Sequence, residues 1–220
     1  EGVALEAANR IGCNIAQGFG MTEASPVTHL LPISDEKKNI GSIGLPIPNT
    51  EVMIVDPETE TPLGKNQNGE IWIRGPQIMK GYLNRPEATA EVFMGEGWLL
   101  TGDIATIDEQ GYVRIVDRKK DMIIVSGFNV YPNELEQTLT AHPGVSQCAA
   151  IGVADTKAGE VVKMFVVSAD PELTEAQVID YCKQTMAGYK VPKYIEFRDQ
   201  LPMSNVGKVL RKDLRDEQAS

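Results

Sequence analysis

Residues 97–136, GWLLTGDIATIDEQGYVRIVDRKKDMIIVSGFNVYPNELE, contain the order of strands and turns that decides the fold. The turn residues DEQG at 108–111 separate an apolar segment from YVRIVD, which predicts two strands joined by a tight turn. A further strand, DMIIVS, follows at 121–126. The next segment places Leu135 and Leu139 on one face and ends at a Pro-Gly pair, which predicts a helix. The stretch therefore predicts a β-rich part that passes into an α/β part.

The chain before this stretch continues the β-rich pattern. TEVMIVD (50–56) and GEIWIRG (69–75) predict strands on either side of a run rich in Pro, Gly and Asn. Pro86 predicts the first turn of a short helix that interrupts the strands. Residues 1–35 show a helical pattern, a strand-like CNIAQGF and the turn-rich GMTEASP.

The chain after this stretch alternates strands and helices. QCAAIGV (147–153), VVKMFVVS (161–168) and YIEFR (194–198) predict strands. Thr174 and Gln177 stand at capping-box spacing before a helix that we expect Gly188 to end. A loop then leads into a final charged helix.

Composition excludes several classes of protein. The net charge of −10 argues against a nucleic-acid partner, because phosphate binding needs a basic surface. The apolar runs are strand-sized, far short of the ~18 residues that a membrane span requires. Three separated cysteines (Cys13, Cys148 and Cys182) and two histidines (His29 and His142) do not indicate a zinc site. Unpaired cysteines favour a reducing cytoplasm.

Four short segments carry candidate chemistry, and each has a plainer alternative. In one interpretation, Gly18–Ala24 places glycine backbone, an aromatic ring, a hydroxyl and a carboxylate around one small ligand. In the other, the segment is only a Gly-rich turn. Asp103 presents a carboxylate to a vicinal diol, or it closes an Asx-turn. The charged side chains of residues 118–121 form a functional cluster, or they are solvated surface charges. Lys208 is a reactive-site cation or a surface lysine.

Taken together and in this order, these segments resemble the sequence motifs of a known enzyme family. QGFGMTEASP, GEIWIRGPQIMKGYLNRPEAT, residues 97–136 and LPMSNVGKVLRKDL closely resemble the carboxyl-terminal portion of the adenylate-forming acyl-CoA synthetases. The residues of these motifs are most similar to those of bacterial long-chain fatty-acid–CoA ligases. The resemblance covers essentially the whole sequence. It does not include the family's Ser/Thr/Gly-rich triphosphate loop or its acyl-binding region, so the chain is expected to be a fragment that is inactive alone.

The resemblance implies a fold and its parts. It implies an α/β (α+β) chain in which a β-rich subdomain, part of a distorted barrel, precedes a small α/β lid domain. Residues 1–35 would be the incomplete end of a large amino-terminal domain. Residues 36–117 would be the β-rich subdomain, and residues 118–220 the lid.

The resemblance also implies roles for residues near the amino terminus. Phe19, between Gly18 and Gly20, matches the aromatic that packs against adenine. Thr22 matches the hydroxyl that contacts phosphate, and Glu23 matches the Mg²⁺ ligand.

Five further positions match functional residues of the family. Asp103 and Arg118 match the contacts to the ribose hydroxyls. Lys120 matches the hinge about which the lid swings between the two half-reactions. Gly127 matches the glycine whose backbone lines the pantetheine tunnel. Lys208 matches the lysine that reaches the α-phosphate and the substrate carboxylate, where a cation would stabilise the gathering negative charge.

The implied activity is ATP-dependent conversion of a long-chain fatty acid to acyl-adenylate, followed by transfer to coenzyme A. ATP/AMP, Mg²⁺ and coenzyme A are the implied cofactors. The partners are small molecules, without nucleic acid. We expect a cytoplasmic enzyme with peripheral association at the inner face of the membrane, and a homo-oligomer stays open. Two alternatives also stay open: an adenylating enzyme that uses an acyl-carrier-protein acceptor, and a non-catalytic nucleotide-binding module.

Overall fold

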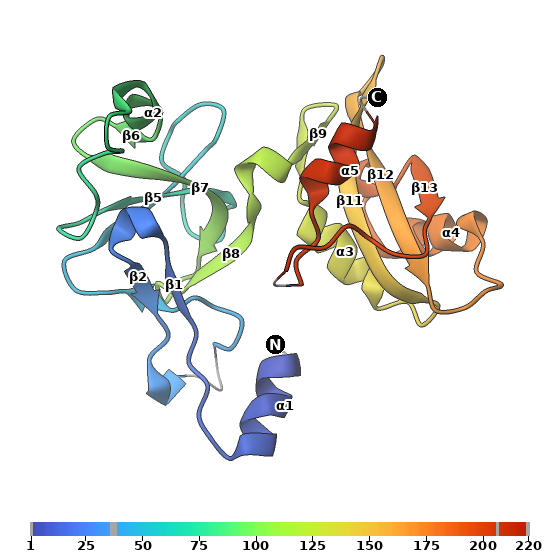
Figure 1. Ribbon diagram of the computed structural model, residues 1–220, viewed down its shortest axis with the longest axis horizontal. Coiled ribbons are helices and arrows are strands. Elements are labelled where there is room, and N and C mark those ends of the chain that lie inside the picture. The colour runs from blue at the N-terminus through green and yellow to red at the C-terminus, as the bar shows by residue number, and fades with distance from the viewer. Residues whose placement is uncertain (1, 36–38, 206, 219–220) are drawn as a thin grey trace. The chain divides into compact units, whose positions relative to one another are not determined.

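The computed structural model describes residues 2–35, 39–205 and 207–218 (Figure 1). The chain divides into two compact units, residues 1–119 and residues 120–220. The three-part division expected from the sequence stays a prediction. No helix in the described part of the chain is long and apolar enough to cross a membrane.

The first unit begins with a helix and a small sheet. The helix α1 (Gly2–Ile11) precedes an antiparallel sheet in which β2 (Val27–Leu30) pairs with both β1 (Gly18–Gly20) and β3 (Leu45–Pro46). The strand expected over CNIAQGF is therefore confined to its last residues and Gly20. Two single turns of 3₁₀-helix flank β2, and they are η1 (Thr22–Ala24) and η2 (Ile33–Asp35).

A larger antiparallel sheet forms the rest of the first unit. Its elements are β4 (Glu51–Val55), β5 (Gly69–Arg74), β6 (Phe93–Met94), β7 (Trp98–Ile107) and β8 (Val113–Arg118), with the helix α2 (Pro86–Glu91) before β6. The strand order is β4-β5-β7-β6, and β8 also pairs with β7. The predicted strands and the helix with proline in its first turn are confirmed.

One apolar cluster holds the two sheets of the first unit together. Its fully buried members are Ile43, Ile54, Ile71, Ile73, Ala105 and Val113. An isolated bridge pairs Gly44, next to β3, with Val113 of β8. A side chain on Gly44 would meet the Leu30 backbone, which explains why glycine stands there. The sheets therefore pack as one curled layer around this cluster.

The second unit is an α/β layer structure. Its elements are η3 (Lys119–Asp121, shared with the end of the first unit), β9 (Ile123–Val125), β10 (Phe128–Val130), α3 (Pro132–Thr140), β11 (Val145–Asp155), β12 (Gly159–Ser168), α4 (Glu175–Thr185), η4 (Gly188–Lys190), β13 (Tyr194–Phe197) and α5 (Arg211–Gln218). The strand order is β10-β9-β12-β11, and β13 adds parallel to β12.

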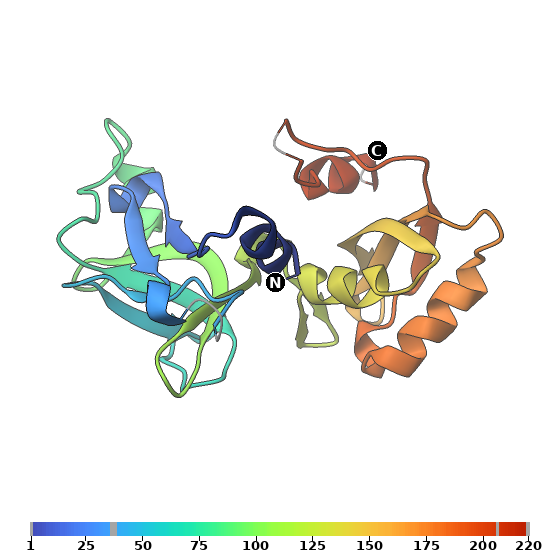
Figure 2. The ribbon, with the colours of Figure 1, turned by 90° about the horizontal axis from the view of Figure 1, so that it is seen from below.

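The two faces of this sheet carry different helices. On one face, Leu135 of α3 and Val178 of α4 pack with Ala150 and Met164 of the sheet. On the other face, Leu214 of α5 packs with other strand residues such as Phe165. Side chains of neighbouring strand residues point to opposite faces, so the continuous apolar strands serve both layers. Figure 2 shows α5 (red) on one side of the sheet and α4 (orange) on the other.

The second unit confirms most of the predicted elements and corrects two details. The capping box of Thr174 and Gln177 is present. However, α4 ends in an extended Met186, and Gly188 instead starts η4. The strand β10 was not predicted, because it exists only by pairing with β9 across the tight turn at 126–127. The mixed α/β fold expected from the sequence is confirmed.

Candidate active site

The Thr-Gly-Asp segment, expected from the sequence as a turn, instead lies inside the strand β7, where it buries a carboxylate. Asp103 lies opposite Arg118 in the β7–β8 pairing, and the Arg118 Nε donates to its Oδ1 at 2.8 Å. Gly102, within the strand, has φ of +70°, a conformation that glycine adopts without strain. The Thr101 hydroxyl accepts from the Asp103 amide at 3.1 Å and donates to the Ile71 carbonyl at 2.7 Å. These contacts fix the orientation of the Asp103 carboxylate.

The second carboxylate oxygen of Asp103 is the unusual feature of this part of β7. Asp103 is only 2% exposed, and its Oδ2 has no hydrogen-bond partner in the part of the chain that the structure describes. A buried acceptor without a donor is costly and therefore points to a ligand. Burial raises the pKa of the Asp103 carboxyl to about 6, with Arg118 opposing the shift and Glu70 adding to it. Two hydroxyl groups of a sugar fit an acceptor of this kind.

Glu70 of β5 contacts the segment of β7 that carries Asp103. Its Oε1 accepts from the Gly102 amide at 3.0 Å, and its Oε2 accepts from the Lys119 Nζ at 2.9 Å. The Glu70 side chain is 3% exposed and the Lys119 side chain is 39% exposed. A charged residue inside the apolar pattern GEIWIRG was the sequence signal for this role. The Glu70 carboxylate thus connects the Asp103 segment of β7 with the end of the first unit.

Thr22 and Glu23 lie on η1, between β1 and β2. Thr22 is exposed and Glu23 is half-buried. The Tyr82 hydroxyl donates to the Glu23 Oε1 at 2.8 Å, and the Met79 amide donates to the Glu23 carbonyl at 2.8 Å. The bond to Glu23 raises the pKa of Tyr82. The segment around Tyr82 therefore holds both the backbone and the carboxylate of Glu23.

Gly18, Phe19 and Gly20 form β1, directly before η1. A side chain on Gly20 would come within 2.0 Å of the Pro26 carbonyl oxygen, so only glycine fits. The Phe19 ring is half-buried against the core cluster and meets the His29 ring edge-on, with centroids 6.1 Å apart. Phe19 therefore has a fixed ring with one part accessible.

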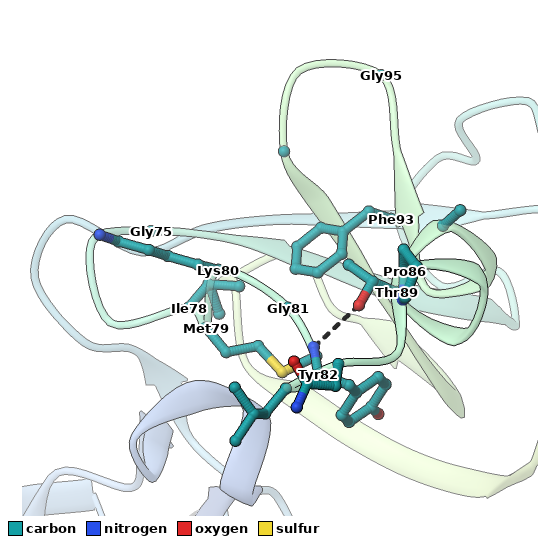
Figure 3. Close-up of a pocket in the computed structure, with 14 residues that line it drawn as sticks. Gly75, Ile78, Met79, Lys80, Gly81, Tyr82, Pro86, Thr89, Phe93 and Gly95 are labelled. Atoms are coloured by element: carbon teal, nitrogen blue, oxygen red, sulfur yellow. Dashed lines mark hydrogen bonds between the residues drawn. The ribbon is translucent and has the colours of Figure 1, made fainter.

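A pocket of about 800 Å³ lies beside the segment around Tyr82 (Figure 3). Its lining comes from residues 75–97, and it includes Tyr82, Thr89 and Phe93. The Tyr82 amide donates to the Thr89 hydroxyl at 2.9 Å, which ties the loop to α2. None of the sequence-predicted site residues lines this pocket. Its nearest link to them is the Tyr82–Glu23 hydrogen bond.

Three predicted site residues lie in the second unit. Lys120 is exposed in η3, directly after Lys119. Gly127 has φ of +81° in the turn between β9 and β10, with open space where a side chain would begin. Lys208 is exposed in a small hairpin in which its amide donates to the Ser204 hydroxyl at 3.0 Å. The predicted loop position of Lys208 is therefore confirmed.

The structure brings some of these residues into direct contact and leaves others apart. Asp103 and Arg118 form an ion pair. In the described ranges, no hydrogen bond or ion pair links that pair to Glu23 or Thr22. Nor does one link Gly127 to Lys208. The same ranges hold no group of three His, Cys, Asp or Glu side chains arranged for a metal. Glu23 would thus be a single protein ligand, which suits Mg²⁺ because this ion keeps water and phosphate ligands.

Comparison with known proteins shows which family the chain is similar to. Residues 1–83 match the family described as AMP-binding enzyme, and residues 134–208 match the AMP-binding enzyme C-terminal domain. The chain is 53% identical over 206 residues to a long-chain-fatty-acid–CoA ligase of Escherichia coli O157:H7. That match covers 94% of this chain and 36% of the relative. It is 46% identical to a feruloyl-CoA synthase of Amycolatopsis, over 93% of this chain and 41% of the relative.

A solved structure extends the comparison to the fold. The crystal structure of ATP-bound MatB from Rhodopseudomonas palustris matches with a TM-score of 0.89 and 36% identity. The match covers 98% of this chain and 43% of that one. The chain thus spans little more than a third of the length of the ligases that it matches. By sequence and by fold, it belongs to the AMP-binding enzyme family.

Proposed function

We propose that this chain is part of a long-chain fatty-acid–CoA ligase, an enzyme that uses ATP to make acyl-adenylate and then acyl-CoA. The observation that carries the proposal is Asp103, a buried carboxylate with one oxygen paired to Arg118 and the other without a donor in the described chain. A ribose supplies a hydroxyl donor for the unpaired oxygen, and its neighbouring hydroxyl is a second donor for the same carboxylate. The high identity to long-chain-fatty-acid–CoA ligases supports the choice of acid.

In the first half-reaction, an oxygen of the fatty-acid carboxylate attacks the α-phosphorus of ATP and pyrophosphate leaves. Asp103 and Arg118 hold the ribose, and Phe19 packs against the adenine. Thr22 contacts a phosphate oxygen. Glu23, held by Tyr82 and Met79, would provide a ligand for Mg²⁺, which would offset the charge of the phosphates. Lys208 places a cation where the two anionic reactants meet.

In the second half-reaction, the thiol sulfur of coenzyme A attacks the acyl carbon, the thiol loses its proton and AMP leaves. The site needs the space near Lys208 for the new nucleophile, so the lid swings about Lys120. Gly127 then lines the pantetheine path, where its lack of a side chain leaves open space. In this proposal residues 1–35 end the large domain, residues 36–117 are the β-rich subdomain and residues 118–220 are the lid. The intact enzyme works in the cytoplasm, with peripheral contact to the membrane.

Lys208→Ala in the complete ligase tests the proposal. Loss of one preorganised charge should slow acyl-adenylate formation by ~10²-fold or more, while thioester formation from supplied acyl-adenylate stays largely intact. Lys212→Ala, an exposed lysine four residues later, is the matched control. Equal losses in both half-reactions would refute the role of Lys208.

The identity of the acid and of the acceptor needs its own assay. A series of fatty acids of increasing length, with ferulate as an aromatic comparison, should give the highest kcat/KM for long chains. Turnover with coenzyme A, but not with acyl-carrier protein, would support the ligase over the carrier-dependent alternative. Nucleotide binding without any turnover would favour a non-catalytic module. The 220-residue chain alone should show no ATP–pyrophosphate exchange and at most feeble AMP binding.

A further inference from the structure

The boundary between the two units falls inside η3, between Lys119 and Lys120. This single turn of 3₁₀-helix has three residues with three different environments. Lys119 is bonded within the first unit, Asp121 is bonded within the second, and Lys120 between them is exposed. A pivot needs one residue that is free to change its dihedrals and neighbours that are not.

Lys119 is fastened to the first unit by a buried partner. Its ammonium group lies 2.9 Å from the Glu70 Oε2, and Glu70 is held in turn by the Gly102 amide. Glu70 is almost fully inaccessible to water, so this pair is screened less than a surface pair. The last residue of the first unit is therefore fixed, through Glu70, to the segment of β7 that carries Asp103.

Asp121 is fastened to the second unit by two arginines of α5. The Arg215 guanidinium donates to its Oδ1 at 2.7 Å, and the Arg211 guanidinium lies 3.7 Å from its Oδ2. The Asp121 side chain is only 9% exposed. Arg211 also binds Glu136 of α3 through two contacts, at 2.7 and 3.1 Å. Glu136 accepts the Ala150 amide of β11 at 2.9 Å, so the network joins α3, β11 and α5.

The same network reaches the hairpin of Lys208. Arg211 is the first residue of α5, three positions after Lys208. The Leu210 amide donates to the Pro202 carbonyl at 2.8 Å, which closes the base of the hairpin. Leu214, one turn later, is fully buried. The base of the Lys208 hairpin is therefore tied to the residue that follows the pivot.

Lys120 differs from both neighbours. Its side chain makes no hydrogen bond or ion pair with the described residues, and it is exposed. We propose that Glu70 and Asp121 are positioning residues that confine the hinge to Lys120, because each locks one neighbour of Lys120 to its own unit. The inference rests on the proposed function in one respect: the two half-reactions are the reason that the lid needs to swing about Lys120. Without either lock, the dihedrals of a second residue join the hinge and the units sample more arrangements.

The first test measures the spread of distances between the units in the 220-residue chain. Spin labels at Glu58→Cys and Glu172→Cys, both exposed, report this spread in a Cys13→Ser background. Lys119→Gln should broaden the distance distribution by about twofold or more, because the hinge gains a residue. Lys119→Arg keeps a cation for Glu70 and should restore the narrow distribution.

The second lock is tested in the same way. Asp121→Asn and Arg215→Gln should each broaden the distribution, and Arg215 is exposed enough that its loss should leave the fold intact. Two controls, Asp180→Asn and Glu51→Gln, remove one partner of an exposed ion pair in each unit. They should leave the width unchanged. Melting temperatures measured in parallel separate loosening of the hinge from loss of folding.

The outcomes decide between the explanations. Broadening in the lock variants, with no broadening in the two controls, supports the inference. Unchanged widths in Lys119→Gln and Asp121→Asn, or equal broadening in the controls, would overturn it. The measurement needs no ATP, acid or coenzyme A, so it is independent of the proposed function. If the complete enzyme forms no acyl-adenylate, the proposed function is refuted. The measured distance distributions, and the inference drawn from them, would not change.

Discussion

At the scale of single residues, Asp103 and His29 have opposite effects on the pH dependence of the first unit. The folded pKa of Asp103 is about 6 against an ordinary 3.8, so the stability that its protonated form provides is lost as pH rises through this range. Burial lowers the pKa of His29 from 6.5 to about 4, so the stability of its neutral form is lost as pH falls through that range. Each shift corresponds to about 3 kcal/mol. Because their windows overlap, we expect them to nearly cancel.

Asp103→Asn should expose the contribution of His29. The free energy of unfolding should then rise by about 3 kcal/mol between pH 4 and pH 6.5, where the two shifts should nearly cancel in the unmodified chain. Urea unfolding followed by tryptophan fluorescence measures this, because both tryptophans, Trp72 and Trp98, lie in the first unit. His29→Leu should give the opposite slope. A flat profile for Asp103→Asn would show that burial does not lower the pKa of His29 in the folded chain.

At the scale of elements, the β9–β10 hairpin depends on two residues with positive φ. Ser126 has φ of +51° and Gly127 has φ of +81°. This pair forms the two-residue turn whose twist suits a hairpin. The hairpin places Phe128 in an exposed stack with Tyr189 of η4, with ring centroids 4.7 Å apart. A turn of two residues thus connects the strand after the hinge with the remainder of the second unit.

Gly127→Ala tests the element in the complete ligase. Alanine meets no neighbouring atom here, so the cost is the strained φ alone, about 1 kcal/mol. Thioester formation should fall by about tenfold or more, because the backbone beside the pantetheine path shifts, while adenylation stays within about twofold. Gly159→Ala is the matched control, since Gly159 has φ of +77° and similar open space. Identical behaviour of the two variants would contradict a role for Gly127 in the thioester step.

At the scale of the whole molecule, the two units have separate cores. Every residue of the two apolar clusters in the second unit lies between Ile123 and Leu214. The cluster of the first unit likewise draws on residues before 119. A unit that closes its own core is able to fold alone.

Residues 120–220 should therefore fold cooperatively as a separate chain. Circular dichroism during thermal unfolding, together with amide dispersion in NMR spectra, should show one transition. Leu214→Ala, which removes a fully buried side chain, should destabilise this piece by about 2–5 kcal/mol. A gradual transition without dispersed amides would show that the second unit needs the first.

Lys120→Pro tests the hinge in the complete ligase. Proline fixes its own φ near −65° and also restricts the residue before it, so both residues next to the unit boundary lose freedom. One half-reaction should be suppressed far more than the other, because the lid is held nearer one arrangement. Single-turnover rates for adenylation and for thioester formation measure this. Equal, intact rates would place the hinge elsewhere.

The sequence by itself determined the elements whose information is local. Apolar runs next to turn residues predicted β4, β5 and β8, and the spacing of Thr174 and Gln177 predicted the start of α4. It also supplied the family resemblance and with it the candidate residues, since Asp103 and Lys208 stand in recognisable order. Local patterns suffice there because propensity, turn chemistry and capping act over a few neighbouring residues.

Only the tertiary structure decided the contacts that join distant segments. The sequence left open whether residues 118–121 form a functional cluster or are solvated charges. In the structure, Lys119 pairs with Glu70, and Asp121 pairs with two arginines of α5. It did not single out Glu70 or Tyr82, whose partners lie tens of residues away. It also missed β10, which exists by pairing. Burial, charge pairing and an acceptor without a donor depend on which segments meet in space, and no local pattern contains that information.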